Sequence, residues 1–236
     1  MDTPVVIEEP ADLGASLAVG YNSHYIFRGV SYGQNQITTQ LDYEITALPI
    51  PVAIGAWYGN PIDSDSAGHV DQHAGHRTGN NPGHLDELDL YASVSHSFGA
   101  IDTWLGYTAY TYPEAGGGNT NEVGTGFGTA LGPIDFAVGG YYDFNIGGWY
   151  FDFTGGHSFV FSDRVSLDLA AGISYQVDYN NTGSDFNNVL LVASLPIALT
   201  ERASLIPYVA ATFSMDAIDG LQDDQLFGGV SLSVSF

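Results

Sequence analysis

The chain has 236 residues and a formal net charge of −23, because 27 acidic residues stand against four arginines and no lysine. Such a charge repels nucleic acid, and the absence of cysteine excludes disulfides, thiolate metal sites and a thiol nucleophile. No apolar run approaches the roughly 18 residues that a membrane helix needs, so this chain can span a membrane only as a closed β-barrel.

The first residues, Met1 to Pro4, lack the basic and apolar segments of an export signal. We therefore expect that an export signal has been removed. We assign residues 1–12 to a periplasmic N-terminal tail and residues 13–236 to a single outer-membrane β-barrel domain.

From residue 14 onward, apolar and polar residues alternate with a period of two along most of the chain. This pattern predicts an all-β fold, a transmembrane up-and-down antiparallel barrel of about twelve strands, an even number as in bacterial single-chain barrels. The predicted strands are 14–27, 36–47, 51–59, 86–98, 101–112, 121–131, 134–145, 148–161, 165–178, 187–198, 202–214 and 225–236.

The connections between these strands alternate in length. Short connections such as 48–50, 97–100 and 131–133 alternate with longer ones that are rich in Gly, Asn and Asp. In bacterial outer-membrane barrels the short turns face the periplasm and the longer loops face the exterior. We therefore expect both termini on the periplasmic side and the longest loop, 60–85, outside the cell.

The alternation also predicts which way side chains face. In strand 165–178 the odd positions are mainly aliphatic, as at Val165 and Leu167, and the even positions are small or polar, as at Ser166 and Asp168. The first face suits lipid and the second a watery lumen. Aromatic residues near strand ends are expected to form outward interfacial girdles: Tyr21, Tyr25, Phe27, Tyr142, Phe144, Trp149, Phe151, Phe159 and Phe161.

A soluble lipocalin-like barrel or a β-sandwich would show the same period with the apolar face turned inside. The number of strands and the serine- and glycine-rich second face favour the membrane barrel. In strand 101–112 both faces carry apolar or aromatic groups, so the pattern leaves its orientation open.

The segment Tyr25-Ile26-Phe27-Arg28-Gly29-Val30-Ser31 resembles the Y-x-F-R-G-[IV]-S signature of the TorF-like porins, also called the Gcw_chp family. Segments 88–92, 107–113 and 163–167 are similar to the same family. The resemblance runs from about Leu17 to Phe236 and implies a bacterial outer-membrane location and a pore of unknown substrate. The chain departs from the family's pattern in its long histidine-bearing loop and its lack of lysine.

Arg28 stands at the end of the first predicted strand, where the alternation points it inward near the extracellular rim. An arginine among lumen carboxylates is drawn into ion pairs, which would pin a loop or shape a constriction. The alternative is that Arg28 ties the first strand to the second. In either case Gly29 permits a tight exit into the first loop.

Carboxylates recur at inward-facing positions, and with Arg28 they are the predicted pore-lining residues: Asp42, Glu44, Glu87, Asp89, Glu122, Asp135, Asp143, Asp152, Asp168 and Asp178. Rings of carboxylates in a pore attract cations and exclude anions. Four tyrosines are predicted to share this lumen: Tyr91, Tyr141, Tyr150 and Tyr208. They indicate a constricted and partly filled interior, in a barrel narrower than the 16-stranded porins.

The loop 60–85 contains a group of histidines that would suit zinc, nickel or copper: His69, His73, His76 and His84. Their spacing needs a helical turn, which Gly68 and Gly75 oppose, and histidine is also an ordinary loop residue. A divalent metal in this extracellular loop is the one cofactor that the sequence indicates. Protonation below about pH 6.5 would release it.

The sequence thus predicts a porin-like channel for passive diffusion of small solutes, with a preference for cations. Its expected partners are outer-membrane lipid, lipopolysaccharide and small solutes or cations, without nucleic acid. The alternative is a closed barrel with a surface-binding or structural role through its loops. Enzymatic activity is not expected, because His96 and His157 stand beside serines that project to the opposite face of an extended strand.

Overall fold

The computed structural model describes residues 13–62, 86–113 and 118–236. These ranges fold into β-strands joined by turns and loops, and they contain no helix. In particular, none of the described residues belongs to a helix that is long and apolar enough to cross a membrane. The predicted N-terminal tail, 1–12, lies outside the described residues.

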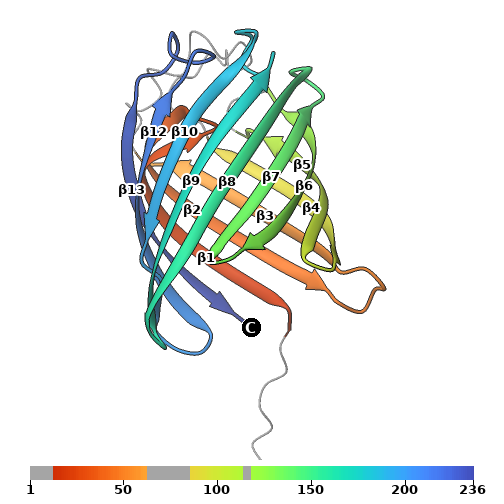
Figure 1. Ribbon diagram of the computed structural model, residues 1–236, viewed down its shortest axis with the longest axis vertical. Coiled ribbons are helices and arrows are strands. Elements are labelled where there is room, and N and C mark those ends of the chain that lie inside the picture. Colours follow the sequence, from red (N-terminus) through yellow and green to blue (C-terminus); the bar gives the residue numbers. More distant parts are fainter. Residues whose placement is uncertain (1–12, 63–85, 114–117) are drawn as a thin grey trace, which may run out of the picture.

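One antiparallel sheet holds all the strands and closes on itself (Figure 1). The bounds are β1 Ala15–Phe27, β2 Val30–Ile45, β3 Val52–Pro61, β4 Glu87–Phe98, β5 Ile101–Thr111, β6 Thr120–Leu131, β7 Ile134–Asp143, β8 Gly148–Ser162, β9 Val165–Val177, β10 Ser184–Ser194, β11 Ile197–Ala198, β12 Ala203–Ser214 and β13 Gln225–Ser235. Because β11 is only a two-residue strand within a turn, the wall consists of twelve strands. The predicted twelve-stranded up-and-down barrel is confirmed.

The last strand closes the barrel against the first. β13 pairs with β1 in antiparallel register from Ser16 opposite Ser235 to Asn22 opposite Gly229. The Leu13 N–H donates to the Phe236 carbonyl oxygen at 2.8 Å. We call the end of the barrel that carries these termini the termini end, and the opposite end the loop end.

The first hairpin differs from its prediction. β2 begins at Val30 rather than at residue 36, and only Arg28 and Gly29 separate it from β1. Both turn residues have positive φ, 52° and 82°, as in the type I′ turn that suits a two-residue hairpin. The predicted first loop is absent because the chain continues at once as a strand, although residues 30–35 show little alternation.

The wall is apolar outside and polar inside. Leu41, Leu105 and Leu226 are 53%, 52% and 73% exposed on the outer surface. The largest fully buried side chains are mostly polar: Ile218, Gln36, Gln176, Glu87, Asn187, Thr212 and Asp143. A soluble barrel would bury its apolar face instead. The distribution is that of a barrel that meets lipid, and it excludes the soluble alternative.

The structure also settles the orientation of β5, which the sequence left open. Tyr110 is 8% exposed inside the barrel and Trp104 packs on the ring of Tyr141, with centroids 5.6 Å apart. Leu105 and Tyr107 are exposed on the outer surface. The aromatic residues at even positions therefore fill the lumen.

Burial of inward-facing side chains changes along the barrel axis. Near the loop end Asp143 of β7 and Gln176 of β9 are fully buried. Further along the same strands, near the termini end, Asp135 and Ala170 are exposed. The lumen is therefore filled in its loop half and open to solvent in its termini half.

Candidate functional site

The tip of the β1–β2 hairpin, residues 26–31, lies inside the lumen at the loop end. A register shift between Tyr25 and Ile26 interrupts the regular pairing just before the turn. The ring of Phe27 lies 5.9 Å from the buried Tyr110, and Tyr25 lies 5.4 Å from Trp57. The prediction that Tyr25 and Phe27 belong to the outward girdle is therefore wrong, because the end of β1 folds into the lumen and brings both rings onto inward-facing aromatic residues.

Arg28 crosses the lumen to a distant strand. Its guanidinium donates to both carboxylate oxygens of Glu122 on β6, at 2.5 and 2.8 Å. In the sheet, β2, β3, β4 and β5 lie between β1 and β6. The two side chains are only 8% and 4% exposed. Arg28 therefore does not tie the first strand to the second; it fixes the hairpin tip to the far wall.

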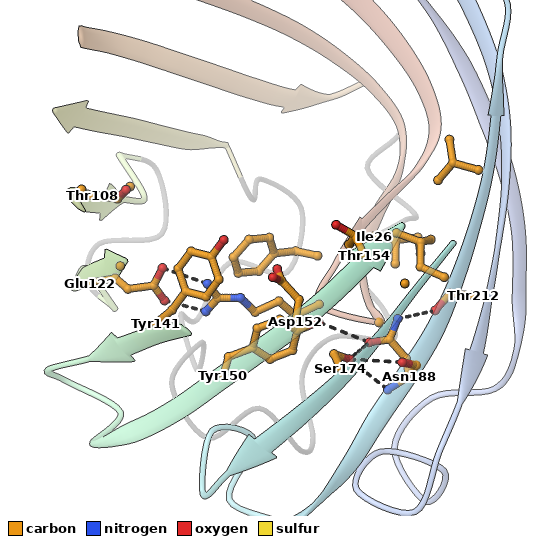
Figure 2. Close-up of a pocket in the computed structure, with 18 of the residues that line it drawn as sticks. Ile26, Thr108, Glu122, Tyr141, Tyr150, Asp152, Thr154, Ser174, Asn188 and Thr212 are labelled. Carbon is orange, nitrogen blue, oxygen red and sulfur yellow. Dashed lines mark hydrogen bonds and ion pairs between the residues drawn. The ribbon is translucent and has the colours of Figure 1, made fainter. Parts of the chain in front are cut away.

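Four aromatic rings surround this guanidinium. The centroids of Phe27, Tyr141, Tyr150 and Tyr179 lie 4.8, 4.7, 4.5 and 4.7 Å from Arg28 Cζ, within the range of cation–π attraction. We call these four residues and Glu122 the Arg28 cage. Figure 2 shows Glu122, Tyr141 and Tyr150 converging on the ion pair.

The charge at the centre of the Arg28 cage is retained. Burial by itself disfavours the charged form of Arg28, but the Glu122 carboxylate compensates through two charge-assisted hydrogen bonds. A charged arginine has hydrogen-bond donors and no acceptor. When it is buried, a carboxylate and aromatic ring faces are therefore suitable partners.

Further contacts hold the hairpin tip from the other side. The Arg28 carbonyl accepts from Asn187 Nδ2 of β10 at 2.7 Å. The Ser31 N–H donates to Gln222 Oε1, in the loop between β12 and β13, at 2.9 Å. A Cβ added at Gly29 would lie 2.8 Å from Ile218 Cδ1, so only glycine fits this close approach. The tip is thus anchored to both sides of the barrel.

The hairpin tip and the Arg28 cage separate two cavities. The inner cavity, toward the termini end, has a volume of about 600 Å³ and is lined by side chains that include Tyr91, Trp104, Tyr141, Asp152, Asn188 and Tyr208. The outer cavity, among the loops, has a volume of about 310 Å³. Phe27 and Tyr110 line both cavities. The partition between them therefore consists of the tip and its cage.

A network of neutral polar groups, which the sequence did not indicate, supports the wall beside the cage (Figure 2). Asn188 Oδ1 accepts from Ser174 Oγ at 2.6 Å and from Asn187 Nδ2 at 2.9 Å. Its Nδ2 donates to Thr212 Oγ1 at 3.0 Å. All these groups are buried. Their hydrogen bonds join β9, β10 and β12. Only polar residues at inward positions of β10 could have signalled it.

Several predicted pore-lining carboxylates lie near the inner cavity or the cage. Asp42 accepts from Tyr91 OH at 2.5 Å and from Gln40 Nε2 at 3.0 Å. Asp152 lines the inner cavity. On β4, Glu87 is 2% exposed and accepts from Tyr112 OH at 3.5 Å, and Asp89 follows it two residues later.

Three others lie toward the termini end, where the lumen is open. Glu44 and Asp135 are exposed. Asp168 accepts from Ser158 Oγ at 2.6 Å and from Ser166 Oγ at 3.2 Å. These carboxylates are separate from the Arg28 cage, so the structure does not bring all the predicted acids into one ring.

Asp143 faces inward as predicted but does not line open space, and Asp178 does not follow the predicted alternation. Asp143 is fully buried and accepts from Thr120 Oγ1 and from the N–H groups of Asn145 and Ile146, so it caps the β7–β8 turn instead of lining open space. Asp178 follows the end of β9 at Val177 and has a φ of 54°. The period-two facing does not extend to it.

The predicted metal ligands His69, His73, His76 and His84 lie outside the described residues. Within the described ranges, no three His, Cys, Asp or Glu side chains form a group that could hold a metal. Two other histidines make edge-to-face contacts with phenylalanines: His96 with Phe98 and His157 with Phe159, with centroids 4.5 Å apart in both pairs. Ser158 Oγ instead bonds to Asp168.

Comparison with solved structures shows the same architecture in outer-membrane barrels. The KdgM porin has a TM-score of 0.57 at 9% identity, over 94% of this chain and 99% of that one. An outer-membrane channel from Pseudomonas putida F1 has a TM-score of 0.56 at 10% identity, over the whole of both chains. The NanC porin has a TM-score of 0.50 at 10% identity, over 94% and 98%. At such identities the likeness shows the fold alone.

Comparison at the level of sequence gives no relative. No protein-family model matches this chain, and no curated protein matches it.

Proposed function

We propose that this protein is a channel of the bacterial outer membrane through which small solutes diffuse passively, with a preference for cations and without catalysis. The observation that carries the proposal is a closed barrel with an apolar outer surface around a polar lumen that holds a cavity of about 600 Å³. In lipid only a closed barrel satisfies every strand edge. The porins and channel of similar fold support the same reading.

The preference for cations follows from the charges of the lumen. Asp42, Glu122 and Asp152 lie at or beside the inner cavity, and Arg28 is already paired with Glu122. The remaining carboxylates leave a negative field that attracts cations and repels anions. The KdgM porin has been described in complex with an oligogalacturonate, which is a polyanion. We do not propose that ligand for this chain, because the acidic lumen of this barrel would repel a polyanion.

The finer assignment to the TorF-like porins belongs to the same proposal. It is supported by the segment from Tyr25 to Ser31, which forms the end of β1 and the hairpin tip. Lipid and lipopolysaccharide are the proposed surroundings, and we propose no nucleic-acid partner, because the net charge of −23 would repel a polyanion. A metal held by His69, His73 and His76 stays a prediction, which metal titration of a His73→Ala/His76→Ala variant would test.

One observation favours a second candidate, a closed barrel that binds ligands through its loops. The hairpin tip and the Arg28 cage fill the lumen at the loop end, and the outer cavity opens on the loop side. If the tip never releases, solutes meet only the outer cavity.

Planar-bilayer recordings separate the two candidates. With purified protein under a salt gradient, we expect stepwise conductance and a reversal potential of cation-selective sign. Asp152→Asn should reduce the selectivity because it removes a lumen charge, whereas Asp163→Asn, in the exposed β8–β9 turn, should not. Absence of conductance from folded protein would refute the channel and support the second candidate. An anion-selective reversal would refute the role of the lumen carboxylates.

A further inference from the structure

Aromatic rings of the inner cavity lie against glycines of the barrel wall. A Cβ added at Gly124 would lie 2.7 Å from Tyr141 and 2.9 Å from Trp104, and one added at Gly126 would lie 2.6 Å from Trp104. Each ring thus occupies the space of a missing side chain. Trp104 is half-buried and lines the inner cavity, so part of its ring is available to a molecule there. The ring of Tyr141 already carries the Arg28 guanidinium.

A carboxylate lies beside these ring faces. The Cβ position of Gly139 is 2.8 Å from Tyr141 and 2.6 Å from Asp152 Oδ1, so ring and carboxylate meet over the same glycine. On the opposite part of the wall, Tyr91 OH donates to Asp42. A ring face next to a carboxylate is the combination that recognises an organic cation, through cation–π attraction and a charge-assisted hydrogen bond.

The chain itself shows this mode of binding in the same lumen. The Arg28 guanidinium lies on Tyr141 and Tyr150 and pairs with Glu122 through two hydrogen bonds. Tyr141 and Tyr150 also line the inner cavity. The Arg28 cage is therefore a guanidinium site that already has an occupant, and it shares two of its rings with the cavity beneath it.

The backbone at Arg28 indicates that this contact is selected for its side chain. Arg28 has a φ of 52°, in the left-handed region that disfavours arginine. The first position of a type I′ turn favours Asn, Asp or Gly. Arginine does not stabilise this turn, so the unfavourable backbone conformation must be offset by the contacts of its side chain in the Arg28 cage. The contacts of the Arg28 cage thus compensate for an unfavourable backbone conformation.

We propose that the inner cavity is a binding site for organic cations that carry a guanidinium group, held between the ring of Trp104 and the carboxylate of Asp152. The inference rests on the proposed channel function, whose class of solute it names. A volume of about 600 Å³ is within the range of small-molecule sites. An arginine-sized molecule fits this space, and the bidentate carboxylate contact favours guanidinium over a spherical cation.

Calorimetric titration of the folded protein in detergent micelles tests the proposal, with methylguanidinium chloride as the probe. We expect saturable binding to the unaltered chain. Asp152→Asn should weaken it at least about tenfold because the charge-assisted hydrogen bond is lost. Trp104→Leu should also weaken it, without any change of charge. The matched control Asp163→Asn removes an acid from an exposed turn outside the cavity and should bind as the unaltered chain does.

The proposal fails if methylguanidinium binds no better than sodium or glucose at the same concentration, or if both Asp152→Asn and Trp104→Leu bind it unchanged. Two variants are used so that one that does not fold, as judged by circular dichroism, leaves the other to decide. Conductance is measured on the same preparation. A cation-selective channel that does not bind methylguanidinium refutes this inference alone, whereas binding without conductance refutes the channel and retains the site.

Discussion

The two halves of the lumen are built from the same strands but differ in what fills them. In the loop half, inward side chains such as Glu122, Gln176 and Asn187 are buried in a connected set of polar contacts. In the termini half, Glu44 and Asp135 are exposed to the open interior. A barrel of twelve strands is therefore not narrow throughout; it is closed locally, by what its loop half places inside.

The difference lies in one structural element, the hairpin tip. The termini half receives only side chains from the wall, whereas the loop half also receives backbone, because residues 26–31 enter it. The inserted backbone brings Arg28, whose charge must be paired because burying an unpaired charge is costly. Glu122 and the rings of the Arg28 cage meet that requirement. The buried polar network and the closure of the lumen are thus parts of the same arrangement.

We expect the two halves to differ most in the free energy of unfolding that is lost when one carboxylate is removed from each half. Glu122→Gln leaves Arg28 buried without its partner, and breaking a buried ion pair in this way costs about 3–5 kcal/mol. Asp135→Asn removes an exposed carboxylate of the termini half and should change the free energy of unfolding by less than about 0.5 kcal/mol. Urea unfolding in detergent micelles measures both. Similar losses in the two variants would contradict the contrast.

A smaller contrast is expected for neutral hydrogen bonds. Asn188→Ala removes the side-chain partner of the buried Thr212 hydroxyl, at a cost of about 1–3 kcal/mol for a group left unsatisfied. Ser174 loses its bond to Asn188 Oδ1 but keeps its bonds to the backbone of residue 188. Ser158→Ala removes an exposed hydroxyl that donates to Asp168, and water replaces it at a cost below about 1 kcal/mol. The same unfolding assay ranks the two. A larger loss for Ser158→Ala would show that the loop half is not the tightly connected one.

The wall of the barrel could be predicted from the sequence because it depends on local alternation. The outward exposure of Leu226 and the pairing of β13 with β1 follow from the period of two and the requirement for closure. The orientation of β5 could not be predicted, because Trp104 and Leu105 are both apolar and only the packing of Trp104 on Tyr141 distinguishes the faces.

The site could be predicted only in part. Alternation predicts that Arg28 and Glu122 face inward. It does not show which strand lies across the lumen from the hairpin tip, so the ion pair between them could not be predicted. The inward facing of Phe27 could not be predicted either, because it depends on the end of β1 folding into the lumen against Tyr110. Asp143 has an inward position but acts as a turn cap, because its neighbours Asn145 and Ile146 present free N–H groups. These outcomes depend on contacts that are distant in sequence or on breaks in the period.

The central claim is that Arg28 holds the loop half of the lumen closed. The variant that tests it is Arg28→Asn, because asparagine suits the left-handed turn position and preserves the hairpin while removing the guanidinium. Arg164→Asn, in the β8–β9 turn at the termini end, removes the same charge elsewhere.

Single-channel conductance of the two variants and the unaltered chain is the measurement that decides. We expect a several-fold higher conductance for Arg28→Asn and no change for Arg164→Asn. An Arg28→Asn barrel that is folded and conducts no more than the unaltered chain would contradict the central claim.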